Sequence, residues 1–279
     1  MLKLHVKARS PAYPGSASEV KRQTVPDELV PWSVPFADYS PPFYVDASVA
    51  AEPCWADRAS DLVAGRIKFN AIDTTGAKPV NRVSLEGPYE LAASGMPMNP
   101  RGRTGLRGRG LMGKFGPNHA ADPIVTRSLV NDDGVLMLEV VLIRRKDTGE
   151  WALPGGMVEN GDTVGRTLEK EFGEEALNSL EGLSKGAKKA LANIFAVQGQ
   201  VVYAGYMDDH RNTDNAWIET TAVHFHDPTG NELFGQIPLH AGDDAGEVAW
   251  VPVTAGMELY ADHAELLAKV CAGLRLPVY

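Results

Sequence analysis

One stretch of the chain, from Gly156 to Glu175, limits most strongly what the rest can fold into. It has the pattern of a tight glycine turn followed by a helix. Within the helix, Val164, Leu168, Phe172 and Ala176 recur every four residues and give it one apolar face. The stretch therefore predicts a helix that packs against a core, entered through a tight glycine turn.

Three glutamates of that helix also share a face. Glu171, Glu174 and Glu175 stand at positions i, i+3 and i+4. Three like charges side by side destabilise a bare helix, and a divalent cation would relieve their repulsion. Because hard oxygen ligands suit Mg²⁺, with Mn²⁺ as a substitute, the face predicts a metal site. The alternative is a glutamate-rich helix face that is simply solvated.

The spacing of the whole segment resembles the sequence box of the Nudix hydrolases. That box consists of a glycine, five intervening residues, a glutamate, seven intervening residues and then Arg-Glu-apolar. One further residue separates this from a Glu-Glu pair, and one more residue separates that pair from Gly-apolar. Here Gly156 is followed without a gap by Asp162, Lys170–Phe172 and Glu174–Glu175. The three acids that the family ties most directly to metal are all present.

Three positions depart from the box, namely Asp162 for Glu, Lys170 for Arg and Leu177 for Gly. Asp162 is one methylene shorter but can still cap the start of the helix. Lys170 keeps the positive charge but loses the bidentate fork that would orient neighbouring carboxylates. We therefore expect the departures to affect the rate rather than the reaction.

Composition excludes several classes of protein. The hydrophobic content of 44% and the charged content of 23% are typical of a globular protein. A net charge of -9 argues against general nucleic-acid binding. No apolar run approaches a membrane span, and the opening residues do not resemble a signal peptide, so we expect no membrane contact by this chain itself. Cys54 and Cys271 form no ligand pattern and are expected to be reduced thiols.

The chain predicts two domains. Residues 1–118 are rich in proline and aromatic residues and are expected to form extended chain with short strands, for example at 45–49 and 85–91. After a boundary near 115–122, strands alternate with helices, which favours an α/β fold in which helices sandwich a mixed sheet. The strands are expected at 123–129, 135–143, 200–206, 216–225 and 246–252, and further helices at 182–197 and 259–274. The Nudix resemblance implies the same α/β/α sandwich for residues 119–279.

The strongest basic cluster of the chain is the run from Arg101 to Gly110, which holds four arginines between glycines. We favour a loop whose arginines pair with other groups of the fold and close it. A phosphate cradle is the second interpretation. A segment that binds RNA is the third, and a single run of this kind is a weak signal for it.

Beyond the box, segments at 102–106, 116–123, 205–217 and 241–246 resemble one branch of the family, the ADP-ribose pyrophosphatases of the mitochondrial type. They resemble equally the homologous C-terminal domain of the melastatin TRP cation channel gated by ADP-ribose. The resemblance implies Mg²⁺-dependent hydrolysis of ADP-ribose to AMP and ribose 5-phosphate, in the cytoplasm or the mitochondrial matrix. The alternative is a sensing domain on the cytoplasmic side of a parent channel. A third reading is an enzyme for another nucleoside diphosphate.

The resemblance also implies the roles of individual residues. Glu171, Glu175 and the backbone carbonyl of Gly155 would hold the metal, with Glu174 as ligand or base. Asp243 and Asp244 are the other candidates for the base, against the alternative of a solvated turn. Contacts with ADP-ribose are implied for His119, Met157, Asp209, Arg211, Leu259, Asp262 and His263. For the two histidines the alternative is a structural role with all hydrogen bonds satisfied.

Overall fold

The computed structural model describes residues 4–15, 20–130, 134, 136–146, 148–177, 185–197, 199–228, 239 and 245–274. The chain divides into two compact units. The first consists of Met1–His119, Glu159–Gly161 and Gly205–Glu219. The second consists of Ala120–Val158, Asp162–Ala204 and Thr220–Tyr279.

The second unit is built on a seven-stranded sheet. Its main path, in spatial order, is β11 (Ala245–Pro252), β6 (Leu136–Arg145), β5 (Gly116–Val130), β10 (Ala216–Asp227) and β9 (Gln200–Tyr206). Two short strands pair with this path, β7 (Trp151–Ala152) with β6 and β8 (Gly156–Met157) with β5. Both short pairings are antiparallel. The pairing of β8 brings the glycine turn next to Ala120 and Ala121 on the long strand.

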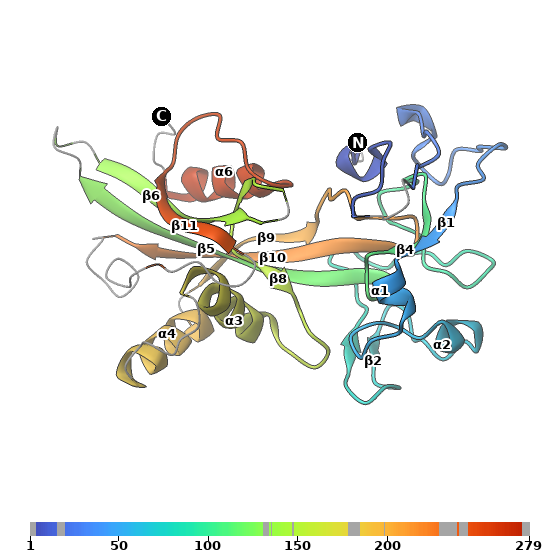
Figure 1. Cartoon of the computed structure of the whole chain (residues 1–279), viewed down its shortest axis with the longest axis horizontal. Helices are drawn as coiled ribbons and strands as arrows, with labels where there is room; N and C mark the ends of the chain where they lie inside the picture. The colour runs from blue at the N-terminus through green and yellow to red at the C-terminus, as the bar shows by residue number, and fades with distance from the viewer. Residues whose placement is uncertain are drawn as a thin grey trace. The chain divides into compact units, whose positions relative to one another are not determined.

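Helices cover both faces of this sheet (Figure 1). On one face lie α3 (Val164–Ala176) and α4 (Lys185–Val197), and on the other lies α6 (His263–Leu274). The core beneath α3 and α4 joins apolar side chains of the helices to those of β5, β6 and β10, among them Val125, Val141, Leu168, Phe172, Leu191, Phe195, Val223 and Phe225. The predicted α/β class is therefore confirmed, and so is the helical turn-and-box segment.

Two boundaries differ from the sequence prediction for physical reasons. The strand expected at 123–129 begins already at Gly116, because the polar residues before Pro123 are also buried within it. The final helix, expected from residue 259, begins only at His263. Ala261 has a positive φ of 50°, a conformation that cannot continue an α-helix, so the chain turns before the helix starts.

The first unit contains little regular structure. Over residues 4–15 and 20–115, its elements are the 3-10 turns η1 (Lys7–Arg9) and η2 (Asp27–Leu29), the short helices α1 (Ala47–Ala50) and α2 (Ala59–Val63), and four short strands. The strand β1 (Phe43–Val45) runs parallel to β4 (Arg107–Gly110), and β2 (Ile72–Asp73) runs antiparallel to β3 (Val80–Asn81).

Both strands that the sequence predicted in this unit were misplaced. The residues expected at 45–49 leave the strand at Val45, because the Asp46 carboxylate accepts a hydrogen bond from the Ser48 amide at 3.0 Å and caps α1. The residues at 85–91 form no strand. Instead the Gly87 amide donates to the Ser84 carbonyl in a turn, and only Leu91 makes an isolated bridge.

The arginine-glycine run closes the first unit, as the favoured interpretation predicts. Arg103 is 7% exposed and lies over the rings of Trp32, Phe36 and Tyr39. Its guanidinium donates to three backbone carbonyls at 2.7, 2.7 and 3.1 Å, those of Leu29, Pro31 and Val34. Gly105 could not be replaced, because its φ is positive and a side chain there would strike the Gln23 backbone.

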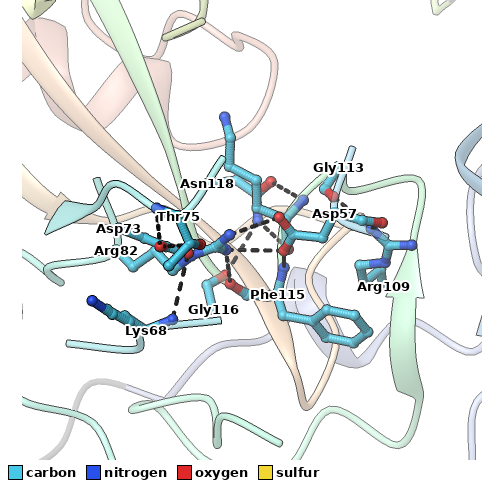
Figure 2. Close-up of polar contacts among 11 residues, drawn as sticks. Asp57, Lys68, Asp73, Thr75, Arg82, Arg109, Gly113, Phe115, Gly116 and Asn118 are labelled. Atoms are coloured by element: carbon cyan, nitrogen blue, oxygen red, sulfur yellow. Dashed lines mark hydrogen bonds and ion pairs between the residues drawn. The ribbon is translucent and has the colours of Figure 1, made fainter. Parts of the chain in front are cut away.

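A buried ion network ties the middle of the first unit together (Figure 2). Arg82 contacts Asp57 at 2.7 Å and Asp73 at 3.2 Å, and all three side chains are less than 9% exposed. The Phe115 amide donates to the same Asp57 carboxylate at 2.8 Å. Hydrogen bonds from the Thr75 amide and hydroxyl, at 3.0 and 2.6 Å, hold Asp73. The network therefore fixes the chain just before β5 begins.

Among the helices that the structure describes, none combines the length and apolar character that a membrane crossing needs. Cys54, exposed in the first unit, and Cys271, buried in α6, are both free thiols.

Candidate functional site

The glycine turn and the glutamate helix meet in the second unit. The backbone N–H of Gly155 donates to Glu175 Oε2 at 2.9 Å. The carboxylate of Glu171 lies directly against Gly156, so close that a side chain at this position would collide with it. Two of the three predicted glutamates are thus held at one point of the backbone, where β8 pairs with β5.

The packing of α3 against the core gives the three glutamates different solvent exposure. Leu168, Phe172 and Ala176 are buried in the core and fix the rotation of the helix. Glu171 and Glu175 are partly buried, whereas Glu174 is exposed to solvent. Thr163 caps the start of the helix, because its hydroxyl accepts from the Arg166 amide at 3.3 Å.

Asp122 is a fourth carboxylate beside this turn, and it was not among the residues predicted from the sequence. It projects from β5 toward Gly155, where an added Cβ would strike its Oδ1. Its Oδ2 accepts from the Thr220 hydroxyl at 2.6 Å, and the side chain is 6% exposed. The available signal was an acidic residue set between Ala121 and the apolar pair Ile124–Val125, since a buried acid needs partners to offset its desolvation.

These groups fit a hard divalent cation. The donors at the turn are carboxylate oxygens of Glu171 and Glu175, with the carbonyl of Gly155 on the same backbone segment. Among the residues that the structure describes, no three His, Cys, Asp or Glu side chains gather closely enough to hold a metal by themselves. A backbone carbonyl and waters would therefore complete the coordination, as Mg²⁺ sites commonly allow. Asp243 and Asp244 lie outside the described residues.

His263 joins the start of α6 to the segment that leads into the turn. Its Nδ1 accepts from the Leu153 amide at 2.9 Å, and its side chain is 8% exposed. The ring of Tyr260 packs edge-on against it at 5.8 Å between centroids. Asp262 precedes the helix, and its carbonyl accepts from the Glu265 amide at 3.0 Å. At least one nitrogen of His263 is thus engaged in holding the fold.

The other predicted contacts of the second unit are more accessible. Met157 is 36% exposed on β8, where it pairs with Ala120. Leu259 and Asp262 are partly buried beside the turn at Ala261. These side chains lie on the segments that flank Gly155 and the start of α6, and none of them enters the apolar core beneath α3.

In the first unit, Asp209 and Arg211 form a bidentate pair. Asp209 accepts from the backbone amide, Nε and Nη2 of Arg211 at 2.8, 2.9 and 2.8 Å. Burial alone would raise the pKa of the Asp209 carboxyl, but the charge and hydrogen bonds of Arg211 outweigh it and hold the pKa at about 2. Asp209 is 3% exposed, whereas the Arg211 side chain is 31% exposed. The carboxylate therefore orients the guanidinium, which reaches solvent.

The N-terminal segment braces the loop that carries this pair, a feature absent from the sequence analysis. Asp208 accepts from the backbone amides of Val6, Lys7 and Ala8 at 2.6, 2.9 and 2.8 Å. His5 Nδ1 lies 2.8 Å from the hydroxyl of Tyr206, and burial lowers the pKa of its imidazole to about 4. Three amides on one carboxylate make Asp208 an anchor for residues 4–9.

His119 is the last residue of β5 that belongs to the first unit. Burial lowers the pKa of its imidazole to about 4, and the nearby charge of Lys114 acts in the same direction. One ring nitrogen bonds the backbone of Val83, while Nε2 is buried with no hydrogen-bond partner in the described structure. His119 is therefore neutral near pH 7, and one of its ring nitrogens has no partner among the described residues.

Two family models match the chain. The model described as NUDT9-like, N-terminal domain, matches residues 25–116, and the NUDIX domain model matches residues 124–270. The second match covers more than half of the chain. Its span includes the glycine turn, α3 and most of α6.

Three curated relatives align over almost the whole chain. A transient receptor potential cation channel subfamily M member-like 2 of Nematostella vectensis is 50% identical over 96% of this chain, which spans only 18% of that protein. The mitochondrial ADP-ribose pyrophosphatase of Rattus norvegicus is 47% identical over 95% of this chain and 77% of its own length. The putative nudix hydrolase 6 of Caenorhabditis elegans is 43% identical over 95% of each chain.

Proposed function

Because this chain belongs to the Nudix hydrolase family, we propose that it hydrolyses ADP-ribose to AMP and ribose 5-phosphate in the presence of Mg²⁺. The observation that carries the proposal is the pairing of Glu171 and Glu175 with the Gly155–Gly156 turn, in a chain 47% identical to an ADP-ribose pyrophosphatase. A soluble hydrolase of this kind would act in the cytoplasm or the mitochondrial matrix.

The proposed reaction balances as a simple hydrolysis. The oxygen of water forms a bond to one phosphorus of the diphosphate, and the bond from that phosphorus to the bridging oxygen breaks. The bridging oxygen leaves with the other phosphate, and a carboxylate accepts the proton that the water loses. Mg²⁺ held by Glu171, Glu175 and the Gly155 carbonyl would offset the charge of the diphosphate and favour ionisation of water.

The residues of the chain have distinct parts in this proposal. The Gly155 amide fixes the Glu175 carboxylate, so this ligand needs no reorganisation when substrate binds. Glu174, exposed beside them, is a candidate for the base, and Asp243 and Asp244 remain the alternatives. Arg211 is suited to fork onto a phosphate, since Asp209 already orients its guanidinium. Met157, Leu259, Asp262 and His263 remain proposed substrate contacts in the second unit.

Product analysis tests the proposal. Chromatography should detect AMP and ribose 5-phosphate when ADP-ribose is incubated with the chain and Mg²⁺, and neither product when a chelator is added. Glu171→Gln and Glu175→Gln should lower the rate by about 100-fold or more, because a neutral amide is a poor ligand for a hard cation. Glu169→Gln, elsewhere on the same helix, is the matched control and should remain active.

The variants are informative because they should fold. A glutamine at position 175 keeps an oxygen that accepts from the Gly155 amide, so thermal unfolding should shift little. Full activity in either the 171 or the 175 variant would show that these residues are not the metal ligands. Absence of AMP from the unmodified chain with Mg²⁺ would refute the proposed hydrolysis.

The second candidate function is sensing of ADP-ribose within a larger cation channel. It is favoured by the 50% identity to a channel relative, of which this chain spans 18%. Binding of ADP-ribose by calorimetry in the presence of Mg²⁺, with no AMP released over the same period, would favour sensing. Transmembrane spans encoded upstream of this segment in the native gene would support the same conclusion.

A further inference from the structure

Three consecutive backbone carbonyls of the first unit accept hydrogen bonds from side chains of the N-terminal segment. The Tyr13 hydroxyl donates to the carbonyl of Arg211 at 2.9 Å. Arg22 Nη2 donates to the carbonyls of His210 and Asn212 at 2.6 and 2.9 Å. Both donor side chains are buried, and the Arg22 guanidinium lies 5.1 Å from the centroid of the Tyr13 ring. Two packed side chains therefore fix the backbone of a loop that lies 188 to 198 residues further along the chain.

Tyr13 is held from a second side as well. Its hydroxyl accepts from the Leu111 amide at 2.8 Å while it donates to Arg211. Gly110, the last residue of the arginine-glycine run, has a φ of 54°, and a side chain there would strike this hydroxyl. Burial raises the pKa of Tyr13 above its ordinary value, so the hydroxyl keeps its proton and remains a donor. The end of the run thus leaves the space through which Tyr13 reaches the loop.

The loop binds the N-terminal segment in return. The carboxylate of Asp208 accepts from the backbone amides of residues 6–8 at 2.6 to 2.9 Å, two of them on Oδ2 and one on Oδ1. The far end of the loop is held by β10, where Asn212 Oδ1 accepts from the Ile218 amide at 2.9 Å. The N-terminal segment therefore holds the part of the loop that precedes Asn212.

The Arg211 guanidinium moves with this backbone. The Arg211 amide and Nε both donate to Oδ1 of Asp209, at 2.8 and 2.9 Å, and Nη2 donates to Oδ2 at 2.8 Å. These three bonds lock the side chain to its own main chain. A shift of the carbonyl that Tyr13 holds would therefore displace the guanidinium, which belongs to a side chain that is 31% exposed.

We propose that Tyr13 and Asp208 are positioning residues: by fastening the N-terminal segment to the loop, they set the place where the Arg211 guanidinium meets a phosphate of the ligand. The proposal rests on the proposed function, in which Arg211 contacts the diphosphate of ADP-ribose. Affinity for that ligand then depends on side chains that act on it through another residue.

Calorimetric titration with ADP-ribose in a buffer that contains a chelator tests the proposal, because without Mg²⁺ the ligand is not consumed. Tyr13→Phe should weaken binding by about fivefold to tenfold, the worth of one buried hydrogen bond. Tyr44→Phe is the matched control. The Tyr44 ring packs edge-on against Tyr13, at 5.5 Å between centroids, but its hydroxyl donates to Asp46 at 2.8 Å. This control should bind ADP-ribose as tightly as the native chain does.

A double-mutant cycle separates positioning from a general loss of stability. In an Arg211→Ala background, Tyr13→Phe should change the affinity by less than about twofold, because the side chain that it positions is gone.

Asp208→Asn is the second variant. Whichever way the new side chain turns, its amide nitrogen faces a backbone N–H, so the N-terminal segment is loosened. Removal of a negative charge would by itself favour an anionic ligand, so weaker binding would reflect position rather than charge.

The outcomes distinguish the positioning from the proposed hydrolysis. If Tyr13→Phe and Asp208→Asn weaken binding and the cycle is not additive, but Mg²⁺ yields no AMP, the positioning stands and the hydrolysis fails. If AMP is released but the losses of Tyr13→Phe and Arg211→Ala simply add, the hydrolysis stands and the positioning is overturned. Native affinity in Tyr13→Phe, an equal loss in Tyr44→Phe, tighter binding by Asp208→Asn, or no binding of ADP-ribose by the native chain would overturn it as well.

Discussion

Replacing Arg82 with methionine would test whether the buried ion network holds the first unit together. The Arg82 side chain is 3% exposed and contacts Asp57 at 2.7 Å and Asp73 at 3.2 Å. Its removal leaves two carboxylates, 8% and 4% exposed, without their cation (Figure 2). Breaking a buried pair from one side costs about 3–5 kcal/mol. Because the Phe115 amide and Thr75 still donate to these carboxylates, we expect about 3 kcal/mol, the lower end of that range.

Urea unfolding would measure this loss as a lower midpoint at an unchanged slope. The midpoint temperature of thermal unfolding should fall by about 6–12 °C, at roughly 2–4 °C per kcal/mol for a protein of this size. Arg66→Met is the matched control, since Arg66 pairs with Asp61 at 2.6 Å but is 55% exposed. A pair of that kind contributes about 0–1 kcal/mol. Equal losses in the two variants would refute the argument from burial.

The stability that Arg82→Met loses should depend on pH. Burial alone would raise the pKa of Asp73, but hydrogen bonds from Thr75, Arg82 and Lys68 outweigh it and lower the pKa below the ordinary value of 3.8. Asp73 therefore adds stability above the unfolded pKa and loses that contribution as the pH falls through its lower folded pKa. The difference between the native chain and Arg82→Met should shrink over the same pH range. A difference that stays constant down to the acid transition would contradict this cause.

Three further predictions concern the candidate site. Gly156→Ala should lower the rate of AMP release by about 100-fold, because the new Cβ displaces the Glu171 carboxylate, whereas Gly165→Ala, with open space around it, should keep its activity. Initial rates should show Lys170→Arg equal to or faster than the native chain, and a large loss would mean that Lys170 has another role. Stability measured between pH 4 and pH 2 should fall less steeply in Asp209→Asn, because the native carboxylate, with a pKa of about 2, loses its contribution as the pH falls through that value.

The parts of the fold that the sequence predicted are those with a regular pattern. The four-residue period of Leu168 and Phe172 specifies a helix with one buried face, and the structure has it at Val164–Ala176. The long apolar strand at 136–145 and the strand at 200–206 are likewise readable from their residues. In such segments local preference and tertiary packing agree, so a window of sequence carries enough information.

The first unit was less predictable because its order comes from side chains that bind distant backbone. Arg103 bonds carbonyls more than 65 residues away, and Asp208 holds amides at 6–8 across about 200 residues. No periodic pattern in the local sequence predicts such contacts. Asp46 illustrates the same limit on a smaller scale, since one capping carboxylate turned a predicted strand at 45–49 into the start of a helix.

The three box glutamates look alike in sequence, and the rotation of α3 is what distinguishes them. At about 100° per residue, Glu171 and Glu175 lie roughly 100° and 60° from Phe172 on the same side of the helix, while Glu174 lies about 160° away. Since Phe172 is 1% exposed in the core, the first two carboxylates emerge at the edge of the buried stripe, where the Gly155–Gly156 turn meets them. Glu174 instead faces water. The apolar residues of α3 thus fix the rotation that places Glu171 and Glu175 at the turn and leaves Glu174 accessible to solvent and to a proton.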